Sequence, residues 1–379
     1  MSVRPSLHSH KRVVIKIGSN VIASRAAGLN EARMQAIATE IAALRAMRRQ
    51  VFVVSSGAVL SGMGPLGLSK RPGTLNLKQA AAAVGQSRLM WAYERCFSRH
   101  DITVAQVLLT REDVADRTRF INARNTLMTL LDYDALPIIN ENDTVAVEEM
   151  KLGDNDHLAA LVAHLVDATL LILLSDVDGL YTADPRQTPS ATRVSQVRKI
   201  TEAIERMAGG TGDLGGTGGM ASKVRAAKNG VACGVATLIL GGGTHDAIRR
   251  AFDGEDIGTL FLPKVTRRSL KKQWIAQRAT RGDVTLDAGA VAAILHKGKS
   301  LLPSGIQSVR GAFKAGDAVR CLAPDGAEIA RGLTNYNASE LRQIAGARSS
   351  EIAARLGHTA DAEAIHRNNM VIHDTASDP

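Results

Sequence analysis

Two strand-like segments flank a helical segment near the start of the chain: RVVIKI (12–17), NEARMQAIATEIAALRAMRRQ (30–50) and VFVVS (51–55). The two strand-like segments are largely continuous apolar runs, as expected for strands that are buried on both faces of a sheet. The middle segment can begin at an N-cap, Asn30, and its apolar residues recur at helical spacing: Met34, Ile37, Ile41 and Leu44. A helix between two buried strands is a β-α-β unit, so the sequence predicts an α/β sheet with helices on both faces.

Four further strand-like runs extend this pattern along the first two-thirds of the chain: VAQVLL (104–109), LPIIN (136–140), TLLILLS (169–175) and VATLILG (235–241). After about residue 260 the pattern changes to short β-like pieces between Gly, Asp and Pro turns, with one helical segment at 288–298. We therefore expect two domains, spanning 1–262 and 281–359, the second a small and mostly β barrel. The last dozen residues are expected to be frayed.

The composition is that of an ordinary globular protein, with 45% hydrophobic and 22% charged residues. The three cysteines are isolated from one another, the basic N-terminus has no apolar segment behind it, and no 18-residue apolar run occurs. We therefore expect a cytoplasmic protein with no signal peptide, no zinc ribbon and no membrane span. The net charge of +10 is compatible with nucleic-acid binding, and equally with solubility and the handling of anionic substrates.

Several strand-like runs end in small, polar or glycine-rich loops, and ligands of α/β sheets bind beyond the carboxyl ends of the strands. Lys16 stands inside an apolar run and needs an anion nearby, which is either a carboxylate or a phosphate. Ser55-Ser56-Gly57-Ala58 is either a simple helix cap or a turn whose backbone approaches a ligand anion. The glycines of 215–219, followed by Lys223, are either a flexible surface loop or a phosphate-binding loop, although the spacing is not that of a Walker A motif.

The most polar part of the chain lies between these loops, at INEND (139–143) and KLGDND (151–156). It is either a set of Asx-turns or a site that hydrogen-bonds a polar ligand. No nucleophile-elbow motif or paired-histidine motif is present. A carboxylate substrate would not need one, since it is already ionised at neutral pH, and lysines with Mg²⁺ would lower the repulsion between the two reacting anions.

In this order, KIGSN (16–20), SSGAV (55–59), INEND, KLGDND, LLSDVDGLYTADPR (173–186) and GTGGMASK (216–223) resemble the motifs of the amino acid kinase superfamily. AAAVGQSRLMWAYE (81–94) and INENDTV with GDND are most similar to the branch that phosphorylates glutamate. The tail resembles a PUA domain in KGKSLLPSGIQSV (297–309), FKAGDAV (313–319) and DGAEIARG (325–332). The resemblance implies a three-layer α/β/α sandwich of the carbamate kinase-like type, followed by a PUA barrel.

The resemblance further implies transfer of phosphate from ATP to the side-chain carboxylate of L-glutamate, the first step of proline biosynthesis, with Mg²⁺ bridging the phosphates and no dedicated protein cage for it. It implies that Lys16 and Lys223 stabilise the transferring group and that Asp156 holds both. The ATP contacts that it implies are Lys16, Ser175, Asp176, Thr217, Gly218, Gly219, Met220, Ala221, Ser222 and Lys223. The glutamate contacts that it implies are Ser56, Asp143 and Asn155, with Asp143 as partner of the α-ammonium. Feedback inhibition by proline and a homo-oligomer follow from the same resemblance.

Two alternatives stay open from the sequence. An RNA-binding protein is suggested by the PUA-like tail and the positive charge, although residues 268–379 carry a net charge of only +4 and few aromatic residues. The other alternative is a kinase of the same superfamily that acts on a different acceptor carboxylate, such as aspartate or acetylglutamate.

Overall fold

The structure, a computed structural model, divides into two compact units, Met1–Lys264 and Val265–Pro379, each with its own hydrophobic core. The residues that it describes are 4–24, 28–146, 155–209, 219–264, 275–276, 278–358 and 361–372.

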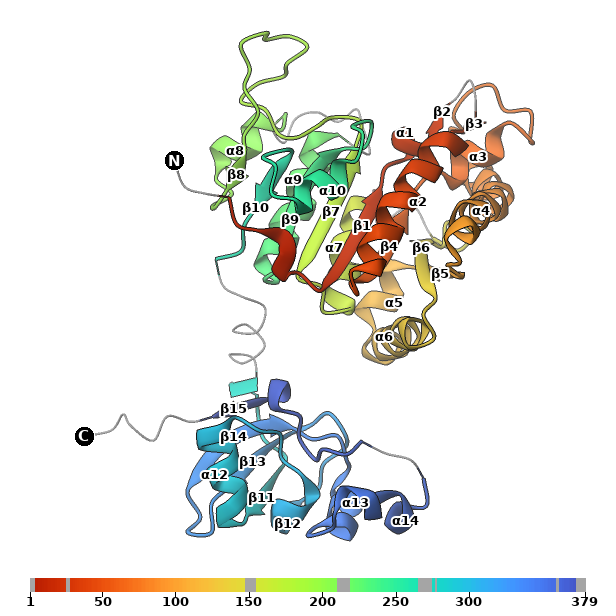
Figure 1. Cartoon of the computed structure of the whole chain (residues 1–379). Helices are drawn as coiled ribbons and strands as arrows, with labels where there is room; N and C mark the ends of the chain where they lie inside the picture. The colour runs from red at the N-terminus through yellow and green to blue at the C-terminus, as the bar shows by residue number, and fades with distance from the viewer. Residues whose placement is uncertain are drawn as a thin grey trace. The chain divides into compact units, whose positions relative to one another are not determined.

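Among the described residues of the first unit, eight strands form one sheet (Figure 1). In spatial order they are β5 (Val104–Leu109), β6 (Leu136–Glu141), β4 (Gln50–Ser55), β1 (Arg12–Ile17), β7 (Leu170–Ser175), β9 (Ala236–Gly241), β10 (Thr259–Phe261) and β8 (Gln196–Val197). The strands from β5 to β9 are parallel to one another, whereas β10 is antiparallel to β9. The sheet is therefore mixed, and its parallel part places the carboxyl ends of six strands along one edge.

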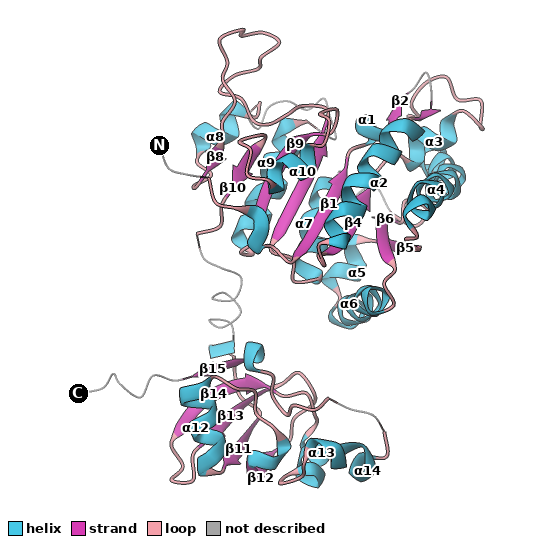
Figure 2. Cartoon of the chain, in the orientation of Figure 1, coloured by secondary structure: helices cyan, strands magenta, loops and turns pink. Residues whose placement is uncertain are grey.

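Helices cover both faces of this sheet, and alternate strand residues face the two sides (Figure 2). Val13 and Ile15 of β1 belong to one core cluster together with apolar residues of α2 (Glu31–Ala46), α4 (Leu75–Phe97) and α10 (Ala247–Phe252). Val14 belongs to a second cluster with residues of α6 (Arg117–Asp132), α7 (Asn155–Leu165) and α9 (Met220–Ala232). This arrangement confirms the predicted three-layer α/β/α sandwich.

The remaining described elements of this unit are short. They are η1 (Leu7–Ser9), α1 (Ser19–Ile22), β2 (Ala23–Ser24), β3 (Gly28–Leu29), α3 (Ala58–Met63), η2 (Ser98–His100), α5 (Arg111–Ala115) and α8 (Glu202–Met207). Of these, α1 and α3 lie directly beyond the carboxyl ends of β1 and β4, so they border the edge where a ligand is expected.

The first β-α-β unit forms as its sequence predicts. Asn30 is the N-cap of α2, and its side chain accepts a hydrogen bond from the backbone N–H of Arg33 at 3.0 Å. The four apolar residues at helical spacing are all buried: Met34, Ile37, Ile41 and Leu44. The expectation of full burial is wrong for 104–109, because β5 is the edge strand of the sheet and most of its side chains are half-buried or exposed.

Helices α3 and α4 cross at a pair of glycines that bring the two backbones into direct contact. A Cβ atom on Gly62 would lie 1.9 Å from the carbonyl oxygen of Ala81, and one on Gly85 would lie 1.8 Å from that of Ala58. Since backbone atoms cannot rotate away as a side chain can, only glycine fits at either position. The crossing therefore fixes α3 on α4.

We expect Gly85→Ala to lower the free energy of unfolding by about 3 kcal/mol, because the added methyl group forces the two helices apart. Gly64→Ala is the matched control, since Gly64 follows α3 with a φ of −58° and a Cβ atom there would meet nothing within 4 Å. Urea denaturation of both variants measures the difference. Equal stabilities would contradict the close helix crossing.

The second unit has a sheet in the order β12 (Ile306–Gly311), β11 (Gly282–Leu286), β13 (Ala318–Leu322), β14 (Glu328–Leu333) and β15 (Met370–Ile372). The helices whose bounds the structure describes in this unit are α12 (Ala288–Lys297), η4 (Pro303–Gly305), α13 (Ala338–Ile344), η5 (Ser349–Glu351), α14 (Ile352–Leu356) and η6 (Arg367–Asn369). The prediction of a second, smaller unit built on a β-sheet is confirmed. The expectation of a frayed end is wrong for residues 370–372, which pair with β14 as an antiparallel edge strand.

Candidate active site

A cavity of about 780 Å³ lies at the carboxyl ends of four neighbouring strands, β6, β4, β1 and β7. The chain leaves each of these strands in a polar or glycine-containing loop, and all four loops contribute to the walls. The lining residues are Lys16, Gly18, Ser19, Asn20, Val21, Ser56, Gly57, Ala58, Val59, Leu60, Arg71, Pro72, Lys78, Asn140, Glu141, Asp143, Asn155, Ser175, Asp176, Gly219 and Lys223. The position agrees with the rule that ligands of parallel α/β sheets bind beyond the carboxyl ends of the strands.

Two lysines that are far apart in the sequence meet on one buried carboxylate in the wall of this cavity. The Nζ atom of Lys16, on β1, lies 2.5 Å from Oδ1 of Asp156, and the Nζ atom of Lys223, on α9, lies 3.1 Å from Oδ2. Asp156 is fully buried, and the two lysines are only 3% and 4% exposed. The three groups carry a formal net charge of +1, so they are suited to hold an anion that enters the cavity.

The charge of the buried Asp156 carboxylate is stabilised by its place at the start of a helix and by a neighbouring hydroxyl group. It lies in the first turn of α7, where the partial positive charge of the helix N-terminus stabilises a carboxylate. The hydroxyl of Ser222, next to Lys223 on α9, lies 2.9 Å from Oδ2 of Asp156 and 2.8 Å from the carbonyl oxygen of Gly219. The cluster thus joins the first turns of α7 and α9 to the C-terminal end of strand β1.

A second carboxylate, Asp176, follows β7 and faces the same cavity. The amide of Asn20 donates a hydrogen bond to it at 3.3 Å, and the hydroxyl of Ser175 donates another at 3.0 Å. Partial burial acts to raise the pKa of Asp176, but these hydrogen bonds and the nearby charge of Lys223 outweigh burial and lower the pKa below its usual value. Asp176 is therefore ionised at neutral pH.

Polar groups of different character line the part of the cavity that β4 and β6 contribute. Asp143 follows β6, while Ser56 and Gly57 follow β4, and Gly57 has a φ of 103°, which favours glycine at this sharp turn into α3. Asn155, at the start of α7, donates hydrogen bonds to the carbonyl oxygen of Ser55 and, at 2.8 Å, to Oδ1 of Asn140. This part of the cavity offers hydrogen-bonding groups and a carboxylate, as a zwitterionic ligand would require.

The structure brings most of the sequence-predicted site residues together. Those that line the common cavity are Lys16, Ser56, Asp143, Asn155, Ser175, Asp176, Gly219 and Lys223, and Asp156 and Ser222 are buried directly beneath them. Met220 and Ala221 are placed differently, because both pack against the hydrophobic core between the sheet and its helices. Thr217 and Gly218 lie outside the described residues, as do the first four residues of KLGDND.

Three further residues belong to this region that the sequence did not single out. Arg71 and Lys78 line the cavity from the segment before α4 and from its first turn. Gln86, about two helical turns beyond Lys78 on α4, accepts a hydrogen bond from Asn140. Charged and amide residues on the surface of a helix are common, so nothing in their local sequence separates them from ordinary solvated residues.

Within the described part of the chain, no group of three or more His, Cys, Asp or Glu side chains is placed to hold a metal ion. Likewise, none of the described helices combines the length and the apolar character needed to cross a bilayer.

Fold and cavity together define a kinase of the amino acid kinase class, and residues 11–240 match the model described as "Amino acid kinase family". Residues 282–356 match the PUA domain. The chain is 51% identical to the glutamate 5-kinase of Geobacter sp. (strain M21) over 96% of this chain and 97% of that protein. It is 46% identical to the glutamate 5-kinase of Stutzerimonas stutzeri over 98% of this chain and 100% of that protein. The chain belongs to the amino acid kinase family, and within it to the glutamate 5-kinases.

A solved structure, that of the carbamate kinase from Giardia lamblia, matches 68% of this chain and 99% of its own length, with 16% identity and a TM-score of 0.49.

Proposed function

We propose that this protein transfers the γ-phosphoryl group of ATP to the side-chain carboxylate of L-glutamate, which gives ADP and L-glutamyl 5-phosphate. This reaction is the first step of proline biosynthesis. The observation that carries the proposal is the pair of buried ammonium groups held on one carboxylate, in a cavity that also contains Asp143 and Asn155. Relatives named glutamate 5-kinase that match nearly the whole chain support the choice of acceptor over aspartate or acetylglutamate. They also favour the kinase over the RNA-binding alternative.

The two lysines act on the phosphoryl group in this proposal. Both reactants are anions, so the main barrier is their mutual repulsion, and the charges of Lys16 and Lys223 offset it as negative charge moves toward the leaving oxygen. Asp156 holds the two ammonium groups in place before the nucleotide arrives, so little reorganisation is needed during the reaction. Ser175, Asp176 and the loop that leads into α9 bind the rest of the nucleotide.

The acceptor end of the cavity holds the amino acid. Asp143 pairs with its α-ammonium group, and Ser56 and Asn155 supply hydrogen bonds. The reacting carboxylate is ionised at neutral pH and attacks without a general base. The absence of a histidine or cysteine nucleophile among the lining residues is consistent with this chemistry.

Magnesium fits the site as a partner of the nucleotide. The described lining residues include Asp176, which is ionised, but no cluster of acidic ligands that would form a complete cage. Bound Mg²⁺ would therefore be held mainly by phosphate oxygens and water, with Asp176 as a candidate protein ligand, and it would neutralise part of the phosphate charge.

A substrate panel tests the proposal. ADP release is measured with L-glutamate, L-aspartate and N-acetyl-L-glutamate, and hydroxylamine in the assay traps an acyl phosphate as the stable hydroxamate. We expect turnover with glutamate and formation of its hydroxamate. Equal or greater kcat/KM with aspartate or acetylglutamate would reject glutamate as the acceptor.

Asp143→Asn should raise the KM for glutamate about tenfold or more, because the variant loses the charge that pairs with the α-ammonium group. The KM for ATP should not change. Asp132→Asn, at the exposed end of α6, is the matched control for loss of one carboxylate. An unchanged KM for glutamate would remove Asp143 from the ammonium site.

Four further features are part of the proposal, of which the first two rest on the family resemblance and the last two on the sequence patterns. They are inhibition by proline, a homo-oligomer built by the kinase domain, location in the cytoplasm, and domain limits at 1–262 and 281–359. A proline titration of the glutamate assay and light scattering of the full chain test the first two. RNA binding by the PUA domain is compatible with its family, and a gel shift at physiological salt tests it.

A further inference from the structure

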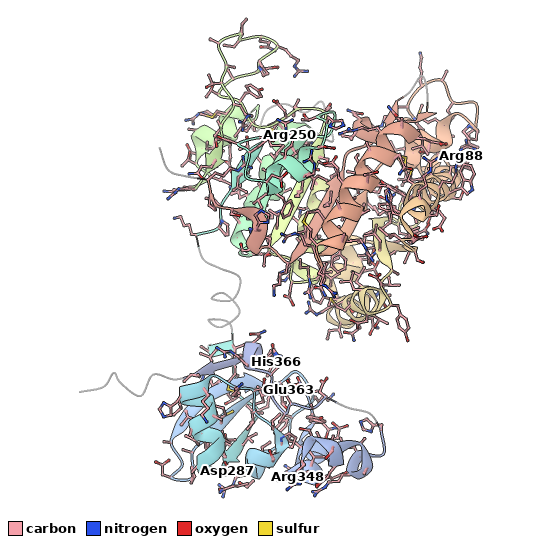
Figure 3. The ribbon with its side chains drawn as sticks, in the orientation of Figure 1. Arg88, Arg250, Asp287, Arg348, Glu363 and His366 are labelled. Carbon is pink, nitrogen blue, oxygen red and sulfur yellow. The ribbon has the colours of Figure 1, made fainter. Side chains whose placement is uncertain are left out.

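A chain of side-chain amides connects helix α4 to the cavity. Gln86 accepts a hydrogen bond from Nδ2 of Asn140 at 2.8 Å, and Oδ1 of Asn140 accepts one from Nδ2 of Asn155, also at 2.8 Å. Asn155 donates as well to the carbonyl oxygen of Ser55 at the end of β4. Figure 3 labels Arg88, which follows Gln86 by two residues on the same helix.

Two backbone groups decide which way each amide points. The carbonyl oxygen of Ser55 can only accept, so Asn155 must present its NH₂ group to it. The backbone N–H of Glu141 can only donate, and it donates to Oδ1 of Asn140 at 2.9 Å, so the NH₂ group of Asn140 must point the other way. Since Asn140 is only 2% exposed, its NH₂ group needs a protein acceptor, and Oε1 of Gln86 is that acceptor.

The hydrogen bonds of Asn155 also determine which of its side-chain atoms can bind a ligand. Both protons of its amide nitrogen are used, one on Ser55 and one on Asn140. Its carbonyl oxygen is then the group available to the cavity that the residue lines. A carbonyl oxygen accepts hydrogen bonds and does not donate them, so it can bind an ammonium group but not a carboxylate.

We propose that Gln86 is a positioning residue that acts through Asn140 to aim the carbonyl oxygen of Asn155 at the ammonium group of the amino-acid substrate. The inference rests on the proposed function for the identity of that substrate. Gln86 itself does not line the cavity. Its second hydrogen bond, from Nε2 to Oε1 of Gln106 on β5 at 3.3 Å, points away from Asn140.

The test compares two substitutions of Gln86. Gln86→Leu removes the acceptor for Asn140 and should raise the KM for glutamate about tenfold, since an unpaired buried amide will turn or take up water and release Asn155. Gln86→Glu keeps an acceptor oxygen at the same reach and should stay within about twofold of the wild-type KM. The KM for ATP should be unchanged in both. Gln106→Ala is the control for loss of the outer hydrogen bond and should behave as wild type.

Glutarate separates positioning from a general disturbance of α4, because it has both carboxylates of glutamate and no ammonium group. Its Ki as a competitor of glutamate should be the same in wild type and in Gln86→Leu, while the KM for glutamate rises. Equal weakening of glutarate and glutamate, or a Gln86→Glu variant as impaired as Gln86→Leu, would overturn the proposal. Thermal unfolding of each variant shows whether the protein is folded. If Gln86→Leu does not fold, the KM of the folded Gln86→Glu variant for glutamate decides the outcome.

Failure of the proposed function has a different signature. In that case the wild-type enzyme does not turn over glutamate. The two Gln86 variants are then compared with the amino acid that it does use and with the deaminated analogue of that amino acid, and the same pattern supports or overturns the positioning role.

Discussion

Lys223→Ala should lower kcat about 10³-fold, because it removes one of the two ammonium groups that stabilise the transferring phosphoryl group in the proposed mechanism. The side chain is 4% exposed and faces the cavity, so its charge acts with little screening by water. The KM for glutamate should change by less than about threefold, since Lys223 is assigned to the nucleotide and not to the amino acid. An assay that couples ADP release to a spectroscopic signal measures both constants.

Lys228→Ala is the matched control for Lys223→Ala. Lys228 lies on the same helix, but its side chain is exposed and pairs with Glu205 at 2.6 Å on the surface. A surface ion pair of this kind contributes little, so kcat should not change. Full turnover in Lys223→Ala would remove its assigned role.

Asp156→Asn should both inactivate the enzyme and destabilise the first unit. The substitution leaves two buried ammonium groups without their shared carboxylate, and loss of one partner from a buried ion pair costs about 3–5 kcal/mol. Chemical denaturation measures the loss in free energy of unfolding. The same ADP-release assay measures activity, which should fall at least as far as in Lys223→Ala.

Two further variants make the Asp156 prediction specific. Asp184→Asn breaks an ion pair with Arg186 whose arginine side chain is 87% exposed, and it should change stability by less than about 1 kcal/mol. Lys16→Met combined with Asp156→Asn removes one of the two ammonium charges that share Asp156 and should recover part of the lost stability. A double variant no more stable than Asp156→Asn would show that charge is not the cause.

The part of the fold predicted most directly from the sequence is the part built from buried strands and amphipathic helices. Apolar runs such as 12–17 and 169–175 form β1 and β7, and the spacing of Met34, Ile37 and Ile41 gives the buried face of α2. Burial enforces these patterns, because each apolar residue must face the core. The expectation of full burial is wrong for β5, because its apolar residues do not reveal that it is an edge strand with a neighbour on one side only.

From the residues alone, the site is most apparent where a residue contradicts its surroundings. Lys16 is conspicuous because a lysine inside an apolar strand requires an anion. From the residues alone its partner is either a carboxylate or a phosphate, because the choice depends on how α7 packs beside β1. Asp156 is identified as that partner only through the family resemblance. Gln86 and Lys78 sit on the long helix α4, where polar residues need no special explanation.

The second unit was harder to interpret for a related reason. Its short strands are predicted from short β-like pieces between Gly, Asp and Pro turns, but α13 and α14 are not, because each is no longer than seven residues. Segments this short carry too few turns to show a periodic pattern, and their stability comes from the core that they cover.

The cluster of Lys16, Asp156 and Lys223 joins segments separated by 140 and 67 positions along the chain. A nucleotide that contacts this cluster can bind only when all three segments have reached their native places. Bound nucleotide therefore stabilises the folded state of the entire kinase unit. ATP should raise the temperature of its thermal unfolding and slow its digestion by proteases, because the stabilising free energy grows with the logarithm of the nucleotide concentration. In a cell with ample ATP, the lifetime of the protein would then depend on the energy charge of its surroundings as well as on its own sequence.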